Sequence, residues 1–447
     1  MLFHSPVFLF YFLPTLFILY FYVNRSFINF SSMILILGGL VFYAWWNLYL
    51  TPIIIGSIII NYFFSKKLIE TKDIAKKRKL LQISIIFNIF YLAIFKYLDF
   101  IILNINFIFN HNIDTLNLPF PLALSFVTFQ TIAYLVDCYD DEISHINFRK
   151  YTLFIIFFPQ LIAGPIVKYN LMSPQFDNIK NKKIISFNVL LGLIILSIGF
   201  IKKVLIADNL ALVVDNGYSF SESLNFLDSW LISLSFTFQL YFDFGGYIDM
   251  ATGIALLFNI RIPQNFNSPY RATSIIDFWQ RWHMTLTSFL TNYIYFPLIR
   301  SLKEITFFKS MLITFFVFFI AGIWHGPTWF YVLFGAFHGL GLIINHCYIK
   351  FINKKINFLL AWFLTFNYIN ISLIFFRSNE IPHVKNILKS MFGFNGFDIS
   401  SYNDYSLNFY FTFFAAIIIC FLFKNTNFLL EESFKKHLSN NSDKNYK

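Results

Sequence analysis

Long apolar stretches recur from one end of the chain to the other, and short polar stretches separate them. Uncharged runs that are long enough, or nearly long enough, to cross a bilayer as helices span residues 7–23, 30–44, 50–64, 80–95, 119–136, 151–167, 184–201, 310–324, 326–345, 356–376 and 407–423. Several of them are short, so we expect tilted or re-entrant helices among them. The pattern predicts an all-α polytopic membrane protein with roughly 11–13 transmembrane or re-entrant helices around a central cavity.

The apolar runs also bear on domain organisation. The first run has no basic segment before it and no small-residue cleavage site, so we interpret it as a retained helix, not a signal peptide. A further apolar run over 229–259 is interrupted by Asp243, Gly245, Gly246 and Asp249. No internal repeat is visible, which disfavours an inverted-repeat transporter. We expect residues 1–447 to form a single integral membrane domain with a short polar tail over 424–447.

Composition excludes the soluble classes. Charged residues make up 13% of the chain and hydrophobic residues 57%, whereas a soluble globular protein carries about 25% charged residues. The same composition excludes a disordered, collagen-like or coiled-coil protein. Cys138, Cys347 and Cys420 are far apart, in or beside apolar runs, and form no CxxC pattern. We interpret them as small core residues, not as a disulfide framework.

The net charge of +11 indicates orientation and not a nucleic-acid partner, because the basic residues lie mostly in short segments between apolar runs. Residues 65–80 carry seven basic side chains against two acidic ones. The positive-inside rule places this segment in the cytoplasm, and the three apolar runs before it then place the N-terminus outside. Further cytoplasmic candidates are Lys180, Lys182, Lys183, Lys350, Lys354 and Lys355.

Two polar blocks depart from a simple helical bundle. The first, over 261–300, combines charges with aromatic residues, and the run 274–290 has helical character. Asp277 and Arg281 are spaced i,i+4 and can pair on one face. Charges at membrane depth face a cavity or a partner. We therefore interpret the block as an interfacial or re-entrant helix with a functional site, and structural anchoring is the alternative.

The second block, over 322–329, places His325 beside Gly326 and Pro327. Proline lacks a backbone donor and disfavours helix at the preceding residue, so we expect the helix to break at His325–Pro327. A break at membrane depth has to line a cavity or the protein interior. His325 is either a functional imidazole or a buried histidine bonded to a backbone carbonyl, and both interpretations stay open at this point.

The order of these segments resembles the membrane-bound O-acyltransferase (MBOAT) family, in its bacterial branch of alginate O-acetylases and peptidoglycan O-acetyltransferases. The resemblance covers nearly the whole chain. It is carried by FHSPVFLF at 3–10, FYAW at 42–45, FKY at 95–97, LSF at 124–126, FQ at 129–130, YLVD at 134–137, FPQLIAGPIV at 158–167, QLYFDFGGY at 239–247, NFN at 265–267, PY at 269–270, FWQRWH at 278–283, GIWHG at 322–326, FG at 334–335 and HG at 338–339.

The resemblance implies site residues. The invariant histidine of the family falls on His325, and its second functional position falls on His283. The chain departs from the usual pattern where Thr291-Asn292-Tyr293 replaces Arg-Asp-Tyr and where Leu298-Ile299-Arg300 replaces a Gly-Gly-Asn element. Two charges are missing there, so docking of an acceptor or a partner need not match that of better-known members.

Acyl transfer chemistry agrees with these assignments. A hydroxyl that attacks a thioester needs a base, and neutral imidazole suits that role near neutral pH. His325 is our candidate base, and His283 could orient a substrate or stabilise charge at the carbonyl. No G-x-S-x-G, H-E-x-x-H or phosphate-binding loop occurs, so we propose no metal and no tightly bound cofactor. His338 lies 13 residues after His325, roughly 220° around a continuous helix, and we interpret it as packing.

Three function hypotheses follow. The first is an O-acyltransferase of the bacterial inner membrane that moves an acetyl group from cytoplasmic acetyl-CoA to an envelope polysaccharide or peptidoglycan, directly or through a separate periplasmic esterase-like O-acetyltransferase. The second is a polytopic carrier that exports a glycan or acyl precursor, and the third is a scaffold. A carrier would show repeat symmetry, and a scaffold would tolerate loss of both histidines. Asp137, Asp243 and Asp249 lie at or near segment ends, and we interpret them as caps, ion-pair partners or channel walls.

Overall fold

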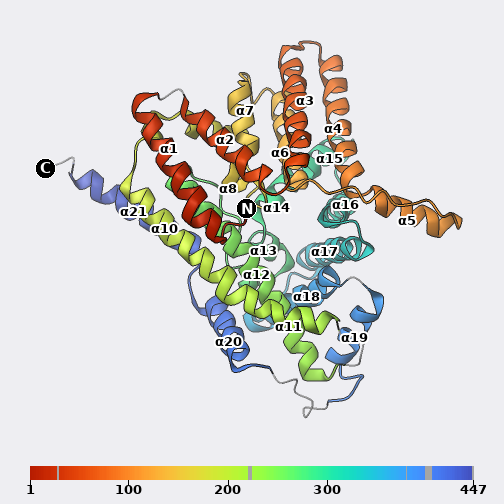
Figure 1. Cartoon of the computed structure of the whole chain (residues 1–447). Coiled ribbons are helices and arrows are strands. Elements are labelled where there is room, and N and C mark those ends of the chain that lie inside the picture. Colours follow the sequence, from red (N-terminus) through yellow and green to blue (C-terminus); the bar gives the residue numbers. More distant parts are fainter. Residues whose placement is uncertain (28–29, 220–223, 379, 398–404, 445–447) are drawn as a thin grey trace. The chain divides into compact units, whose positions relative to one another are not determined.

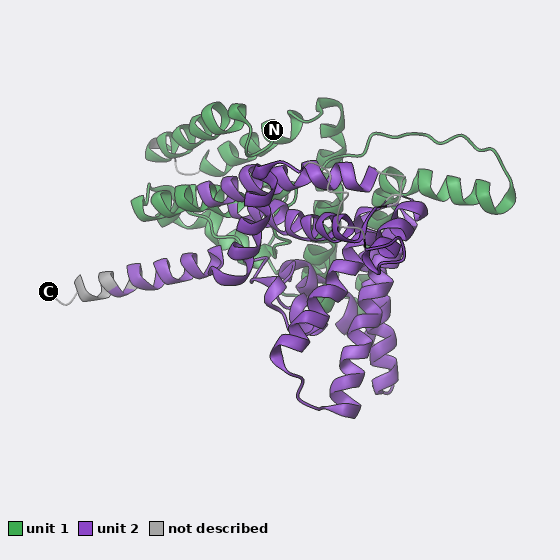
Figure 2. Cartoon of the chain, turned by 90° about the horizontal axis from the view of Figure 1, so that it is seen from below, with its two compact units in different colours: residues 1–196, 250–263, 291–293 green, residues 197–249, 264–290, 294–447 purple. Residues whose placement is uncertain are grey.

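The computed structural model describes residues 1–27, 30–219, 224–378, 380–397 and 405–444 (Figure 1). These residues form helices and contain no β-strand, which confirms the all-α polytopic class. The chain divides into two compact units, coloured separately in Figure 2. The first comprises residues 1–196, 250–263 and 291–293, and the second comprises residues 197–249, 264–290 and 294–447.

The helices that lie wholly or mostly in the first unit are η1 Val7–Phe12, α1 Leu13–Ser26, α2 Ser31–Ala44, η3 Leu48–Leu50, α3 Thr51–Glu70, α4 Ile74–Lys96, α5 Leu98–Phe109, α6 Leu124–Tyr139, α7 Phe148–Ile156, α8 Phe158–Leu161, α9 Tyr169–Asp177, η4 Ile179–Lys182 and α10 Ser186–Phe200. Those wholly or mostly in the second are η5 Ile201–Ala207, α11 Asp208–Ser219, α12 Phe226–Leu257, η6 Pro269–Arg271, α13 Ile275–Trp279, α14 Met284–Leu290, α15 Phe296–Arg300, α16 Phe307–His325, α17 Trp329–Cys347, η8 Tyr348–Ile352, α18 Phe358–Arg377, α19 Ile381–Met391, α20 Leu407–Leu422 and α21 Thr426–Lys444. The short η7, Thr291–Tyr295, has residues in both units.

Seven helices in the described part of the chain are long and apolar enough to cross a membrane. They are Val7–Arg25, Leu48–Glu70, Ile74–Lys96, Ser186–Ser219, Phe307–His325, Trp329–Ile352 and Phe358–Arg377. An eighth is reached if α20 and α21, which bend by 48° at their junction, form one span. The expected 11–13 counted re-entrant segments as well, and apolar runs such as 30–44 form helices too short for this count.

Most of the cationic segment 65–80 is helical. α3 continues to Glu70 and α4 begins at Ile74, so only three residues link the two helices. The Asp73 side chain caps α4 by accepting hydrogen bonds from the backbone N–H groups of Ala75 and Lys76. Most of the basic residues therefore extend the two helices, because lysine and arginine are good helix formers. The cytoplasmic location of this turn stays a prediction.

A cluster of aromatic rings forms part of the core of the first unit. Phe3, Phe8, Phe42 and Phe158 contact one another with ring centroids 5.0–6.2 Å apart. Polar contacts also join helices of the first unit. Asn61 of α3 and Asn88 of α4 each donate a side-chain hydrogen bond to the other. Paired amides satisfy each other inside an apolar bundle, where an unpaired amide would be costly.

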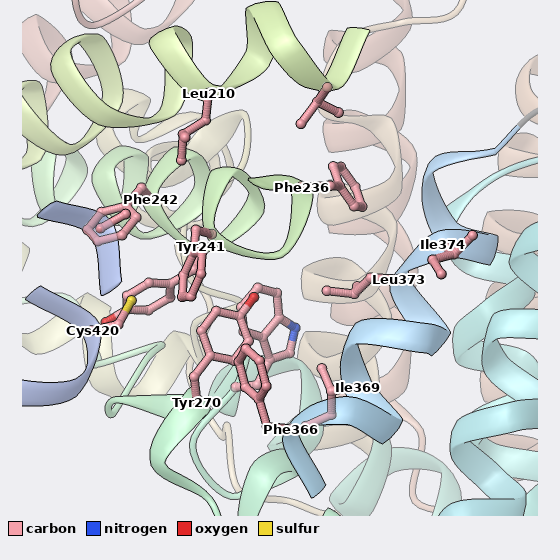
Figure 3. Close-up of a cluster of buried hydrophobic side chains, with 14 of the residues drawn as sticks. Leu210, Phe236, Tyr241, Phe242, Tyr270, Phe366, Ile369, Leu373, Ile374 and Cys420 are labelled. Carbon is pink, nitrogen blue, oxygen red and sulfur yellow. The ribbon is translucent and has the colours of Figure 1, made fainter. Parts of the chain in front are cut away.

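The second unit has a core that positions the two polar blocks of the sequence (Figure 3). Phe236, Tyr241 and Phe242 of α12 pack with Tyr270 of η6 and with residues of α18 such as Phe366. Tyr270 donates a hydrogen bond from its hydroxyl to the Thr237 carbonyl, and its own carbonyl accepts one from Trp362. The segment before α13 is thereby held against α12 and α18.

α12 is continuous where the sequence suggested an interruption. It runs for 32 residues through Asp243, Gly245, Gly246 and Asp249. Lys203 pairs with Asp243 at 2.6 Å, and Lys202 pairs with Asp249 at 2.6 Å. A Cβ atom at Gly246 would lie 2.8 Å from the Gly199 carbonyl oxygen, so the glycine permits this close approach. Asp243 and Asp249 are thus ion-pair partners, one of the roles expected for them.

Candidate active site

The break between α16 and α17 lies where the sequence predicts it. His325 is the last residue of α16, and Gly326 continues in an extended conformation. The Thr328 hydroxyl then accepts a hydrogen bond from the Tyr331 N–H and caps α17. The break leaves the His325 ring at the C-terminal end of α16, where the negative end of the helix dipole stabilises a positive charge that forms on the imidazole.

Two glycines near the break, Gly322 of α16 and Gly335 of α17, allow the two helices to approach closely. A Cβ atom at Gly335 would lie 2.7 Å from the Gly322 Cα atom, and one at Gly322 would lie 2.8 Å from the Gly335 Cα atom. No side chain fits at either position without moving a helix. The pair therefore fixes the separation of the two helices, and with it the position of His325.

Gly335→Ala is expected to destabilise the protein by about 1–3 kcal/mol, because the added methyl group overpacks the helix contact. The displaced α16 should also lower acyl transfer per folded molecule. Thermal unfolding in detergent and transfer assays on the same preparation measure both effects. Gly56→Ala is the control, since nothing lies within 4 Å of a Cβ atom there. Equal behaviour of the two variants would show that the glycine contact does not position the site.

Aromatic side chains surround the half-buried His325 ring. Phe376 of α18 lies 5.2 Å from it, Phe334 lies 5.7 Å away and Tyr331 lies 6.3 Å away, measured between ring centroids. Trp324 contacts the rings of both His325, at 5.0 Å, and His283, at 6.4 Å. The structure therefore brings the two predicted histidines to the same tryptophan. An apolar shell of this kind excludes water from the ring that it surrounds.

His283 interrupts the helix that the sequence suggested over 274–290. α13 ends at Trp279 and α14 begins at Met284, and His283 adopts a left-handed conformation with φ of 44°. The helical character expected over 274–290 is confirmed in α13 and α14, which this turn separates. Left-handed backbone is uncommon outside glycine and is often found at functional sites. The turn buries His283 against Phe244 of α12, with ring centroids 4.9 Å apart.

Asn265 fixes the tautomer of His283. The Asn265 Oδ1 atom accepts hydrogen bonds from the Thr285 N–H at 3.2 Å and from the Thr285 hydroxyl at 2.9 Å, which identifies it as the amide oxygen. His283 Nδ1 lies 3.2 Å from the same oxygen and must donate to it. Burial, together with the neighbouring His325, lowers the pKa of His283. The ring is therefore neutral and carries its proton on Nδ1.

The nitrogen of the same amide has no partner among the described residues. Asn265 Nδ2 is buried and makes no hydrogen bond, although an unpaired buried amide group costs about 1–3 kcal/mol. Unpaired donors of this kind in native proteins often serve a ligand or a reaction. Sequence reasoning placed Asn265 in a motif and gave it no role. A role for Asn265 is indicated only by its contact with His283 in the structure.

Comparison with known proteins decides the family. A family model for MBOAT, the membrane-bound O-acyltransferase family, matches residues 138–377, more than half of the chain. The chain belongs to the membrane-bound O-acyltransferase family. The match includes both His283 and His325. The protein is accordingly an O-acyltransferase, as the sequence predicts.

Three relatives show where the chain lies within the family. It is 42% identical to a peptidoglycan O-acetyltransferase of Helicobacter pylori, over 89% of this chain and 80% of the relative. It is 33% identical to a probable alginate O-acetylase of Pseudomonas syringae pv. tomato, over 91% and 78% of the two chains. A teichoic acid D-alanyltransferase of Streptococcus thermophilus is 27% identical over 57% and 68%. The predicted bacterial branch of the family is confirmed.

His338 lies near the candidate site, but both nitrogens of its ring are engaged. Trp279 Nε1 donates to His338 Nδ1 at 3.2 Å, so the proton of a neutral His338 lies on Nε2. His338 Nε2 then donates to the Ser372 hydroxyl at 2.9 Å, and Ser372 donates to the Ile369 carbonyl at 2.7 Å. The fully buried ring joins α13, α17 and α18 and has no lone pair left for a substrate. This agrees with a packing role.

Of the two segments in which this chain departs from the family pattern, Thr291-Asn292-Tyr293 lies in η7 and Leu298-Ile299-Arg300 lies in α15. Tyr293, which the pattern retains, donates a hydrogen bond from its hydroxyl to Asp137 at 2.8 Å. Lys168 lies over the Tyr293 ring, 5.3 Å from its centroid. All three residues belong to the first unit, and Asp137 is buried there. Asp137 therefore has a structural partner in this O-acyltransferase.

Proposed function

We propose that the protein is an O-acetyltransferase of the bacterial inner membrane. It takes an acetyl group from acetyl-CoA on the cytoplasmic side and delivers it to a hydroxyl of an envelope polysaccharide or peptidoglycan, directly or through a separate periplasmic esterase-like O-acetyltransferase. The names of its relatives support this acceptor class, because they act on peptidoglycan or alginate. The observation that carries the proposal is the placement of His325 at a helix break beside His283 and Asn265.

In the proposed reaction, His325 is the general base. Its imidazole takes the proton of the acceptor hydroxyl while the hydroxyl oxygen attacks the thioester carbonyl. The tetrahedral intermediate collapses, the carbon–sulfur bond breaks, and the imidazolium returns the proton to the leaving thiolate. The products are the acetyl ester and the free thiol. The end of the α16 helix dipole stabilises the transient imidazolium.

Asn265 supplies the complementary stabilisation in this proposal. Negative charge develops on the carbonyl oxygen during attack, and fixed amide donors stabilise such charge without reorganisation. Asn265 Nδ2 is a buried donor with no partner in the described structure. Its oxygen is held by Thr285 and His283, so the direction of the Nδ2 group is fixed. His283 then acts as a positioning residue for Asn265.

A cavity of about 350 Å³ supports entry of a phosphorylated donor near this site. Its wall includes Arg271, Arg281 and Lys424, against one carboxylate, Glu431. Arg281 pairs with Asp277 at 2.6 Å, which leaves Arg271 and Lys424 as the cations for the phosphate groups of coenzyme A. Gln264 and Asn267 line the same cavity on either side of Asn265 in the sequence. Arg281, another wall residue, precedes His283 by two positions, so the cavity wall and the candidate site share this segment.

Charge distribution supports a cytoplasmic position for this cavity. Lys350, Lys354 and Lys355 precede α18 and favour the cytoplasm by the positive-inside rule. If α18 and the 16-residue α20 each cross once, Lys424, just after α20, lies on the cytoplasmic side.

Lys424→Glu is expected to raise the KM for acetyl-CoA about ten-fold with little change in kcat, because the exposed side chain contacts phosphate and not the reacting atoms. Transfer of labelled acetyl from acetyl-CoA to polymer in inverted membrane vesicles measures both constants and tests the function itself. Lys435→Glu makes the same charge change on α21 outside the cavity and serves as control. Labelling from right-side-out vesicles alone, or an unchanged KM in Lys424→Glu, would contradict the donor assignment.

A further inference from the structure

A larger cavity of about 610 Å³ lies at the opposite end of α20 from the basic cavity. The segment that begins α20 lines the larger cavity, and the segment that follows α20 lines the basic one. α20 has 16 residues, which corresponds to about 24 Å along its axis. The two cavities are therefore separated by the length of one short membrane helix. If the basic cavity faces the cytoplasm, the larger one faces the outside.

The length of the span that ends in α11 also places the larger cavity on the outer side of the membrane. α10, η5 and α11 form one span, Ser186–Ser219, of 34 residues. A helix of this length extends about 51 Å, whereas the hydrocarbon core is about 30 Å thick. The span begins beside Lys180, Lys182 and Lys183, the predicted cytoplasmic residues. Its last residues, which form one wall of the larger cavity, then extend beyond the hydrocarbon on the outer side.

The described residues that line this cavity are polar or apolar, and none of them is charged. Its polar side chains are amides and hydroxyls, from Asn209, Asn216, Ser219, Tyr405, Ser406 and Asn408. Leu212, Val213 and Phe409 supply apolar surface between them. Amides both donate and accept hydrogen bonds, so they match sugar hydroxyl and acetamido groups, and the apolar side chains match the C–H faces of sugar rings. Among the described residues that line this wall there is no Lys, Arg, Asp or Glu.

Contacts connect the cavity wall to the catalytic residues. Asp215 and Tyr218 lie on the same turns of α11 as Asn216. Arg377 at the end of α18 pairs with Asp215 at 2.7 Å and lies over the Tyr218 ring at 5.6 Å. The preceding residue, Phe376, contacts His325. One short path of packed side chains thus leads from α11 to the proposed base.

We propose that this cavity binds the acceptor glycan, and that the glycan is an uncharged amino-sugar chain bearing hydroxyl and acetamido groups, not a polyuronate. The inference rests on the proposed function, since it names the acceptor class of the same reaction. A polyuronate carries one carboxylate on each sugar, and a site for it would need cations to compensate these charges. The amide-rich wall instead suits neutral sugars.

Binding of two probes to the full-length protein in nanodiscs tests the proposal. The probes are chitotetraose, an uncharged N-acetylated amino-sugar tetramer, and tetramannuronate, and isothermal titration gives their affinities. Chitotetraose should bind at least ten-fold more tightly than tetramannuronate. The comparison is repeated in His325→Ala, where the affinity should be unchanged because no turnover is needed for binding. Loss of catalysis and loss of glycan binding are thereby measured separately.

Two variants locate the binding. Asn216→Leu removes an exposed amide from the wall, and Leu212→Trp narrows the cavity from a position that is 67% exposed. Each should weaken chitotetraose binding at least ten-fold. Asn367→Leu, the same change on α18 away from the cavity, should leave it unaltered. Unchanged affinity in both cavity variants, absence of chitotetraose binding, or equally tight binding of tetramannuronate would each overturn the proposal.

Discussion

His325→Ala is expected to lower acetyl transfer by about 10²–10⁴-fold, which corresponds to about 3–5 kcal/mol of activation free energy. The variant loses the proposed base, while the aromatic shell of Phe334, Phe376 and Tyr331 stays in place. The measurement is the acetyl content of the envelope polymer per unit of membrane-inserted protein. Abundance and unfolding temperature should remain close to those of the unmodified protein, because the half-buried ring lies at a helix end.

Two other histidines provide matched controls on the same helix pair. His346→Ala, near the end of α17 and away from the site, should retain normal activity and abundance. His338→Ala leaves the buried Trp279 N–H without an acceptor, so we expect a loss of about 1–3 kcal/mol in the free energy of unfolding. Its activity should fall in proportion to its abundance. Near-normal acetylation in His325→Ala at normal abundance would refute the catalytic assignment and favour a carrier or scaffold.

Asn265→Asp is expected to lower kcat by about 10²–10³-fold, the usual effect of removing one oxyanion donor. The carboxyl group keeps an acceptor for Thr285 and His283 but loses the Nδ2 donor. The assay is acetyl transfer at saturating acetyl-CoA, with His283→Ala measured beside it as the positioning residue.

Thr285→Val is the control for this prediction. It removes the Thr285 hydroxyl that donates to Asn265 Oδ1 but leaves the backbone donor of Thr285 and the Nδ2 group. We expect a kcat loss of less than ten-fold and a loss in stability of about 1 kcal/mol. A kcat in Asn265→Asp close to that of Thr285→Val would show that the amide nitrogen does not contact the transition state.

The parts of the site that sequence could predict are those with local causes. The break at His325 follows from Gly326 and Pro327, and the apolar runs define most of the membrane helices. The turn at His283 has no such cause, because left-handed backbone at a histidine is imposed by tertiary contacts with Phe244 and Asn265. The periodic pattern around it therefore predicted a helix that the structure interrupts.

Ion pairs between residues far apart in the sequence could not be predicted from the sequence either. Asp243 and Asp249 interrupt an apolar run, and only the structure shows Lys203 and Lys202 beside them. The unpaired Asn265 amide nitrogen is a property of three-dimensional packing and leaves no pattern along the chain. Such features depend on which segments pack together, whereas the periodicity of apolar residues predicts only the secondary structure of each segment.

The hydrogen bonds around His338 also determine where a proton can travel. Trp279 donates to His338, His338 donates to Ser372, and Ser372 donates to the Ile369 carbonyl. All three hydrogen bonds of this row therefore point the same way, and the row ends on a peptide oxygen that cannot release a proton. A proton taken up by His325 has no exit along this row. In the proposed reaction it returns to the departing thiolate. The acetyl group would then cross the membrane without net charge movement, and dissipating the membrane potential would leave the rate unchanged.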